Sequence, residues 1–275
     1  MSVIKKLHLV YFSPSGTTEK TVRTIASGIE GLPVEVHNLL PYESRRKKYT
    51  FGPNDLVIMG TMTAGKLFTL SDELFACLEA EGTPFIGAVT YGNEYYGISL
   101  TEMNERAEGR GFRVLALGAF PVQHSSVPEF GTGRPDEKDK EIMRDFGRKA
   151  WGKVQEGDYE LHNVPGTNWS GIEEVDKLVA YREAHRDEQY EFPREWKKKE
   201  ITDDCIKCRT CVRNCPTNAI NIEEKTFDLD ACIACWACIN RCPKHAIISI
   251  SPQRIEIANK FMGLFTKRLE PEIFM

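Results

Sequence analysis

Eight of the nine cysteines of this chain lie in two runs near its C-terminus, and the runs share one spacing. Each run reads Cys-x-x-Cys-x-x-Cys-x-x-x-Cys-Pro, and the second follows the first by 27 residues. The cysteines are Cys205, Cys208, Cys211 and Cys215, then Cys232, Cys235, Cys238 and Cys242. Thiolates at this spacing ligate iron–sulfur clusters, because three of them can surround one corner of a cubane. The repeat therefore predicts two 4Fe–4S clusters.

Other uses of cysteine fit the pattern less well. A four-cysteine zinc site usually shows two Cys-x-x-Cys pairs without a trailing Cys-Pro. A disulfide framework is typical of small secreted domains, and nothing in the sequence indicates export. The ninth cysteine, Cys77, lies beside Leu74, Phe75 and Leu78 in a predicted helix. We expect a small buried side chain there, without a chemical role.

Residues 200–250 resemble the bacterial two-4Fe–4S ferredoxins along nearly their whole length. After each cysteine run, a Pro-x-x-Ala-Ile turn leads into β-like alternation, at 220–223 and 247–250. In that family the fourth cysteine of each run ligates the other cluster. The resemblance therefore implies one cluster on Cys205, Cys208, Cys211 and Cys242, and a second on Cys232, Cys235, Cys238 and Cys215. Arg209 and Trp236 then lie beside the clusters, where they either affect the reduction potential or are inert surface side chains.

The first 156 residues alternate apolar, β-like runs with helical patterns. The predicted strands are 7–12, 34–39, 56–61, 85–91 and 112–122, and the predicted helices are 18–29, 70–80, 100–108 and 137–155. This alternation predicts an α/β fold with a doubly wound, five-stranded parallel sheet. Apolar runs such as DLVIMG suit strands that are covered on both faces.

The loop after the first predicted strand contains Ser13, Ser15, Gly16, Thr17 and Thr18, and it opens a helix. Hydroxyls and backbone N–H groups at such a junction bind anions, and the helix dipole adds to the attraction. Alone, such a turn can equally be a helix cap. The pattern is neither a Walker loop nor the dinucleotide motif. It matches the phosphate loop of flavodoxins, and this resemblance implies FMN binding.

Two further loops follow the third and fourth predicted strands. In a flavodoxin-like sheet of order 2-1-3-4-5 they meet the phosphate loop at the carboxyl edge. The resemblance implies flavin contacts from Thr61, Met62, Thr63, Ala64 and Gly65 in one loop, and from Tyr91, Gly92, Asn93, Tyr95, Tyr96 and Gly97 in the other. The tyrosines either stack on the ring or pack the loop onto its own sheet. Flavodoxins often carry an aromatic residue in the first of these loops, so its absence here predicts a more open flavin face.

Three polar features have two interpretations each. Lys66 either stabilises the reduced flavin from its pyrimidine edge or is a solvated lysine at a helix start. His124 lies in the loop 121–137, which is long enough to be a lid. This histidine either donates a proton to a substrate or to the flavin, or is solvated. For the basic cluster at 43–49 we favour an inert solvated loop over a contact with an acidic partner protein.

The remaining segments connect and end the chain. Ser170 and Glu173 form a predicted capping box in the connector 157–199, and Ile172, Val175 and Val179 recur at helical spacing, which predicts a docked helix. Apolar residues of the last segment, 251–275, predict an amphipathic helix that packs on the N-terminal domain; they are Ile255, Ile257, Phe261, Met262 and Phe265. The alternative is a helix that binds a partner or a membrane surface.

Composition limits the class of protein. The 275 residues allow one mid-sized domain and a small one, with 41% hydrophobic and 28% charged residues and a net charge of −4. No apolar run approaches the ~20 residues of a membrane span, and no signal peptide is evident. The balance of 36 basic and 40 acidic residues gives no nucleic-acid signature. Oxygen-labile clusters and an unpaired thiol predict a cytoplasmic location.

The chain as a whole, divided at 1–156, 157–199, 200–250 and 251–275, resembles the fused flavodoxin–ferredoxin proteins of anaerobic bacteria and archaea. The resemblance implies electron transfer between two clusters and FMN, exchanged with a redox partner such as a ferredoxin or a flavoprotein. One alternative is a ferredoxin-fed, flavin-dependent reductase of a small molecule; another is a docking domain that has lost its flavin. Whether the chain is an enzyme stays open at this point. No second nucleotide-binding domain is evident, so direct use of NAD(P)H is not expected.

Overall fold

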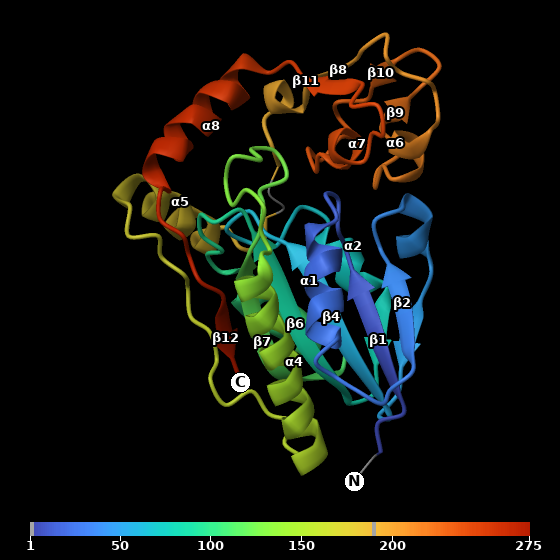
Figure 1. Ribbon diagram of the computed structural model, residues 1–275, viewed down its shortest axis with the longest axis vertical. Coiled ribbons are helices and arrows are strands. Elements are labelled where there is room, and N and C mark those ends of the chain that lie inside the picture. The colour runs from blue at the N-terminus through green and yellow to red at the C-terminus, as the bar shows by residue number, and fades with distance from the viewer. Residues whose placement is uncertain (1–2, 189–190) are drawn as a thin grey trace.

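The computed structural model describes residues 3–188 and 191–275, except for the side chains of Ile257, Phe261 and Met262 (Figure 1). Its central sheet has the strand order β2-β1-β4-β6-β7-β12. These strands are β1 (Lys6–Tyr11), β2 (Val34–Asn38), β4 (Asp55–Met62), β6 (Thr83–Tyr91), β7 (Phe112–Pro121) and β12 (Glu272–Phe274). The first five are parallel and in the flavodoxin-like order, so the predicted fold class is confirmed.

Helices cover both faces of this sheet and create two apolar cores. The helices α1 (Thr17–Ala26) and α4 (Glu137–Glu156) pack on one face. The helices α2 (Ser71–Ala76) and α3 (Ser99–Glu108) pack on the other. Strands buried on both sides need largely apolar sequence, which is why β4 and β6 are mostly apolar and almost fully buried.

Three short strands that pack with the sheet domain were not predicted. The sixth strand of the sheet, β12, pairs antiparallel with β7 and comes from the C-terminal segment. The helix predicted over 70–80 was wrong in its second half, because α2 ends at Ala76 and β5 (Leu78–Ala80) follows. β5 pairs with β3 (Tyr49–Phe51), next to the 3-10 helix η1 (Tyr42–Arg46). Strands of three residues are too short to show a periodic pattern.

The connector contains α5 (Glu173–Ala184) and η2 (Arg194–Lys197). Val175 and Val179 are buried against Tyr95, so the expected helix is docked. The predicted capping box was wrong, because Ser170 lies outside the first helical turn. Its Oγ donates to Asp176 Oδ1 at 2.8 Å instead.

The C-terminal segment forms α8 (Pro252–Leu264) and then β12. Ala258 and Phe265 pack on Val127 and Phe130 of the 121–137 loop, whereas Ile255 is exposed. The predicted apolar residues Ile257, Phe261 and Met262 lie outside the described side chains.

The cluster domain sits over the carboxyl ends of the parallel strands (Figure 1). Its elements are β8 (Lys199–Ile201), α6 (Thr210–Arg213), β9 (Ile220–Asn221), β10 (Thr226–Phe227), α7 (Ala237–Asn240) and β11 (Ile247–Ser249). The sequence repeat is also a repeat of backbone conformation. Positive φ angles occur 27 residues apart at Lys207 and Ala234, at Arg209 and Trp236, and at Asn218 and His245. Both halves therefore turn in the same way around their cysteines.

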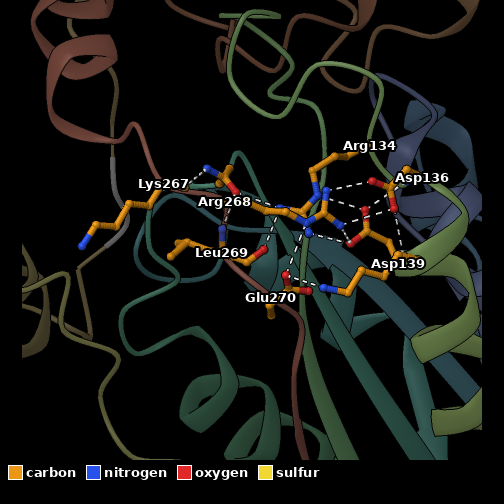
Figure 2. A network of polar contacts seen from close by, with 9 residues as sticks. Arg134, Asp136, Asp139, Lys267, Arg268, Leu269 and Glu270 are labelled. Carbon is orange, nitrogen blue, oxygen red and sulfur yellow. Dashed lines mark hydrogen bonds and ion pairs between the residues drawn. The ribbon is translucent and has the colours of Figure 1, made fainter.

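A polar network fixes the segment that leads into β12 (Figure 2). Arg134 donates to both carboxylate oxygens of Asp139 at 2.9 and 2.6 Å, and this pair is almost completely buried. A third donor of Arg134 contacts Asn93 Oδ1 and the carbonyl of Leu269. Arg268 reaches Asp139 from the other side at 2.8 Å. The end of the chain is thereby tied to the loop that precedes α4.

Replacing Arg134 by methionine is expected to destabilise the protein by about 3–5 kcal/mol, because the Asp139 carboxylate loses its buried partner. The matched control is Lys138→Met, which breaks an exposed pair with Glu270 and is expected to cost about 1 kcal/mol or less. Chemical denaturation followed by tryptophan fluorescence measures both. Equal effects of the two substitutions would contradict the buried role of Arg134.

Candidate functional site

Two small cavities in the C-terminal domain are each lined by four cysteines. Cys205, Cys208, Cys211 and Cys242 line one of them. Cys215, Cys232, Cys235 and Cys238 line the other. The fourth cysteine of each run therefore lies with the first three of the other run, as the ferredoxin resemblance implied.

The donor chemistry of these cavities suits iron. Backbone N–H groups of Ala219 and Ala246 donate to the sulfurs of Cys215 and Cys242 at 3.2 and 3.3 Å. Burial raises the pKa of Cys235 and raises that of Cys238 to about 12. A buried thiol gives up its proton only beside a strongly cationic partner, and the iron of a cluster is such a partner. The residues present therefore fit iron–sulfur ligation.

The predicted phosphate loop joins β1 to α1. Gly16 has a φ of 93°, in the left-handed region that favours glycine. Ser13 Oγ accepts from the N–H of Glu19 at 2.9 Å, and the hydroxyls of Thr18 and Thr90 are 2.8 Å apart. Throughout 3–188 and 191–275, no protein acceptor contacts the backbone N–H groups of 15–18. Free N–H donors at a helix N-terminus fit a phosphate group, so this loop suits the phosphate of FMN.

A larger cavity of about 180 Å³ lies at the carboxyl edge of the sheet. The loops after β4 and β6 form one wall, with Met62, Thr63, Ala64, Gly65, Tyr91, Gly92, Glu94 and Tyr95. The 121–137 loop forms a second wall with His124, Ser125, Ser126, Val127 and Phe130. The connector, the cluster domain and α8 close it with Leu178, Arg182, Phe192, Trp196, Ala234, Trp236, Arg254 and Ala258. All parts of the chain thus meet around one cavity.

Four residues of the predicted flavin loops lie outside the wall of this cavity and position the loops instead. Tyr96 donates from its hydroxyl to Glu272 at 2.9 Å and packs in the core. This tyrosine therefore packs its loop onto the sheet, which was one of the two expected roles. Asn93 bonds the carbonyl of Lys267. At Gly97 a Cβ atom would lie 2.0 Å from a backbone oxygen, so glycine allows the two loops to touch. Thr61 is buried near the end of β4.

The structure contradicts one of the two predicted roles of Lys66. Its side chain is buried, so the solvated lysine was wrong. Its Nζ donates to the carbonyls of Arg186 and Glu188, both at 2.7 Å, just beyond the C-terminal end of α5. A cation is favourable there, because the last carbonyls of a helix carry partial negative charge. Since Lys66 lies outside the cavity wall, we leave it out of the proposed flavin site.

Two arginines fasten the cluster domain to the sheet domain. The solvated loop expected at 43–49 was wrong for Arg45, which is buried and donates to carbonyls of Leu39 and Pro216. Arg241 donates to the carbonyls of Pro14 and Ser13 at 2.9 and 2.6 Å. Each contact joins the sheet domain to a residue adjacent to a cluster cysteine. The phosphate loop and the cysteine runs are therefore held in fixed positions.

His124 is partly buried in the cavity wall. Its Nδ1 accepts from the N–H groups of Ser126 and Val127 at 3.1 and 3.0 Å, which leaves Nε2 as the protonated nitrogen. Burial, with Arg254 adding to it, lowers the pKa of His124 to about 4. At neutral pH this ring is therefore an uncharged hydrogen-bond donor. At Gly92 a Cβ atom would lie 2.1 Å from the His124 ring, so glycine lets the 121–137 loop close.

Several cavity residues were missed by sequence reasoning. Phe68, Phe192 and Trp196 supply aromatic rings to the cavity, the last two from the connector. Trp236 lines both the large cavity and the cavity of the second cysteine set, and Arg254 lies over its ring at 4.4 Å. Burial raises the pKa of Glu94 to about 7, against the opposing effect of Arg182. Only Trp236 had a signal in the sequence, its place inside a cysteine run.

Comparisons with known proteins find similarities in both halves of the chain. Residues 204–246 match the family model of the 4Fe-4S dicluster domain. The chain is similar to a solved flavodoxin from the domain Archaea, at 21% identity and TM-score 0.38, covering 55% of this chain and 99% of that chain. It is also similar to oxidised flavodoxin 2 from Bacillus cereus, at 17% identity and TM-score 0.35, covering 54% and 99%. The search of curated proteins finds no match.

Among the described helices, none is long and apolar enough to span a bilayer. The strand order of the sheet is flavodoxin-like, and the matched family holds iron–sulfur clusters. The chain thus joins a flavodoxin-like α/β domain to a 4Fe–4S dicluster domain, the fusion that its sequence resembles.

Proposed function

We propose that this chain is an electron-transfer protein that holds two 4Fe–4S clusters and FMN in electronic contact. When bound, the clusters exchange single electrons and the flavin two, so together they connect one-electron and two-electron redox chemistry. The observation that carries the proposal is the position of Trp236, which lines both the large cavity and the second cysteine cavity. One side chain therefore separates the two sites, and electron tunnelling requires such proximity.

The chain's own residues would hold each group as follows. The free N–H groups of 15–18 bind the FMN phosphate, and the loops after β4 and β6 contact the ring. Arg241, the residue preceding Cys242, fixes the phosphate loop by donating to the carbonyls of Pro14 and Ser13. His124 offers an uncharged Nε2–H donor to the cavity. Val127 and Phe130 help to exclude water from it.

The size of the cavity favours a carrier over the reductase alternative. Its volume of about 180 Å³ is close to that of an engineered 150 Å³ cavity that binds a single benzene ring. A three-ring isoalloxazine is larger than one benzene ring, so it would take up all of this space and extend beyond it, which leaves no room for a second molecule. Cys208 of the first cysteine set is exposed, whereas Cys235 and Cys238 of the second are buried. We propose that a ferredoxin or flavoprotein partner exchanges electrons at the first set.

Replacing Glu94 by glutamine is expected to make the flavin potential less dependent on pH. The Glu94 carboxyl has a pKa of about 7 and ionises as the pH rises through that value. Its negative charge then disfavours added electrons, so the wild-type potential falls. A few kcal/mol of such repulsion corresponds to tens of millivolts. Redox titrations at about pH 6 and about pH 8 should show a higher potential for the variant only at the higher pH; parallel pH profiles would contradict this.

Anaerobic kinetics separate the carrier from the reductase. The reduced protein is offered a ferredoxin, a flavoprotein, quinones and nitro compounds as acceptors. Fast exchange with a protein acceptor, together with slow reaction with all small molecules, supports the carrier. Turnover of one small molecule that is lost when the 121–137 loop is shortened would instead support the reductase. A cytoplasmic location in an anaerobe belongs to the same proposal, since it rests on oxygen-labile clusters.

A further inference from the structure

A cluster of potential metal ligands, separate from the two cysteine sets, lies near the edge of the sheet that β2 forms. His8 is on β1, Glu35 and His37 are on β2, and Asp55 begins β4. His8 is paired with Glu35 in the parallel register, and His37 is two residues further along the same strand. Alternate residues of a strand share a face, so these side chains converge on one side of the sheet. The phosphate loop leaves the carboxyl end of β1, whereas His8 and Asp55 lie toward the amino ends of β1 and β4.

Donor atoms of three residues in this cluster lie close enough together to share one ion. Nδ1 of His8 lies 3.0 Å from Nε2 of His37. Oε2 of Glu35 lies 3.9 Å from His8 Nδ1, and Oε1 lies 3.8 Å from His37 Nε2; one ligand atom from each of the three residues lies within 4.8 Å of the other two. Bonds of 2.0–2.2 Å to a tetrahedral metal place neighbouring ligand atoms about 3.4 Å apart. Small side-chain rotations would therefore complete the site.

Asp55 supplies the partner that a metal-bound histidine requires. Its Oδ1 lies 3.3 Å from Nε2 of His8, the ring nitrogen that faces away from the cluster. That Nε2 is buried and makes no hydrogen bond of good geometry within the described residues. Histidine ligands usually donate their second ring N–H to a carboxylate, which fixes the tautomer and the ring orientation. Asp55 is therefore the positioning residue of this site.

The surroundings allow a cation to enter. The side chains of His8 and His37 are only 8% and 10% exposed, but that of Glu35 is 49% exposed, so the site opens to solvent on one side. Lys6 pairs with one oxygen of Glu35 at 3.0 Å and leaves the other oxygen for a metal. The rings of Phe51 and Tyr49 pack edge-on against the two imidazoles and cover the buried side.

We propose that His8, His37 and Glu35 bind a divalent transition-metal ion, with zinc the closest match to two imidazoles and one carboxylate. The open side leaves the fourth position to water. Such an ion would fasten the edge strand β2 to β1 in place of the ring-to-ring hydrogen bond. The inference does not rest on the proposed function, because the site uses none of the residues assigned to the clusters or to FMN.

Equilibrium dialysis of the intact protein, loaded with clusters and flavin, against buffered zinc tests the proposal. The wild type is expected to bind one zinc per chain with its iron content unchanged. Glu35→Gln and His37→Gln should each weaken binding at least about 100-fold, and Asp55→Asn about 10–100-fold. Lys6→Gln should strengthen binding, because a competing positive charge is removed. The matched control is His162→Gln, an exposed histidine paired with Asp158.

Two results would overturn the site: no zinc bound by the wild type, or equal binding by the wild type, Glu35→Gln and His37→Gln. Because the Glu35 side chain is half exposed, its substitution is expected to leave the fold intact and keeps the test valid if His37→Gln fails to fold. Thermal melting supplies a second readout: zinc just sufficient to saturate the wild type should raise its melting temperature clearly more than that of Glu35→Gln.

Discussion

Replacing Cys235 by alanine is expected to remove the second cluster and to stop electron transfer between the first cluster and the flavin. Cys235 lines the second cysteine cavity and is adjacent to Trp236, which borders the large cavity. A 4Fe–4S cluster needs four cysteine ligands, so three thiols are expected to lose it. Iron analysis of anaerobically purified protein should show about half the wild-type iron. Flavin reduction by a reduced ferredoxin should slow by orders of magnitude.

Cys77→Ala is the matched control for this substitution. The Cys77 thiol is buried, donates to the carbonyl of Leu74 at 3.2 Å and has a pKa raised by burial. Its loss should leave the iron content and the kinetics unchanged. Cys215→Ala should behave like Cys235→Ala, whereas Cys242→Ala should behave like Cys205→Ala. If Cys215→Ala instead behaved like Cys205→Ala, the assignment of the fourth cysteine of each run to the other cluster would be refuted.

Replacing Ser15 by aspartate is expected to weaken FMN binding at least about 100-fold. The new carboxylate would lie among the free N–H groups of 15–18, occupy them and repel the phosphate. Hydrogen bonds to charged groups contribute about 1.5–3 kcal/mol each, and losing two of them gives an effect of this size. Fluorescence titration of flavin-free protein with FMN measures the affinity.

Ser27→Asp, at the other end of α1, is the control with the same change in charge. Its Oγ donates to the carbonyl of Thr24 and is remote from the phosphate loop, so FMN affinity should stay within a few-fold of wild type. Riboflavin lacks the phosphate and should bind Ser15→Asp as well as it binds wild type. A similar loss of riboflavin and FMN would show that the substitution damages the ring site rather than the phosphate site.

Much of the fold could be predicted because its signals are local. Strands such as β4 and β6 are mostly apolar and buried, and the phosphate loop and the cysteine runs are contiguous motifs. The strand β12 could not be predicted, since three residues carry no periodicity and its partner β7 lies far away in the sequence. The end of the helix predicted over 70–80 was missed for the same reason.

The cavity wall could be predicted only where one loop forms it. Phe192, Trp196, Trp236 and Arg254 reach the cavity because the connector, the cluster domain and α8 dock on the sheet domain. That docking depends on distant contacts such as Arg241 with the carbonyl of Ser13. Charge patterns were equally uninformative for Lys66, whose buried ammonium group binds the end of another helix. A sequence shows that a residue is charged but not which carbonyl it will meet.

The central claim is that one polypeptide holds two iron–sulfur clusters beside a bound flavin. Anaerobic purification followed by iron, sulfide and FMN analysis, with optical and paramagnetic spectra, tests it most directly. The account predicts about eight iron and about one FMN per chain, with flavin absorption bands above a broad cluster shoulder. Colourless protein, zinc in place of iron, or clusters without flavin would contradict it.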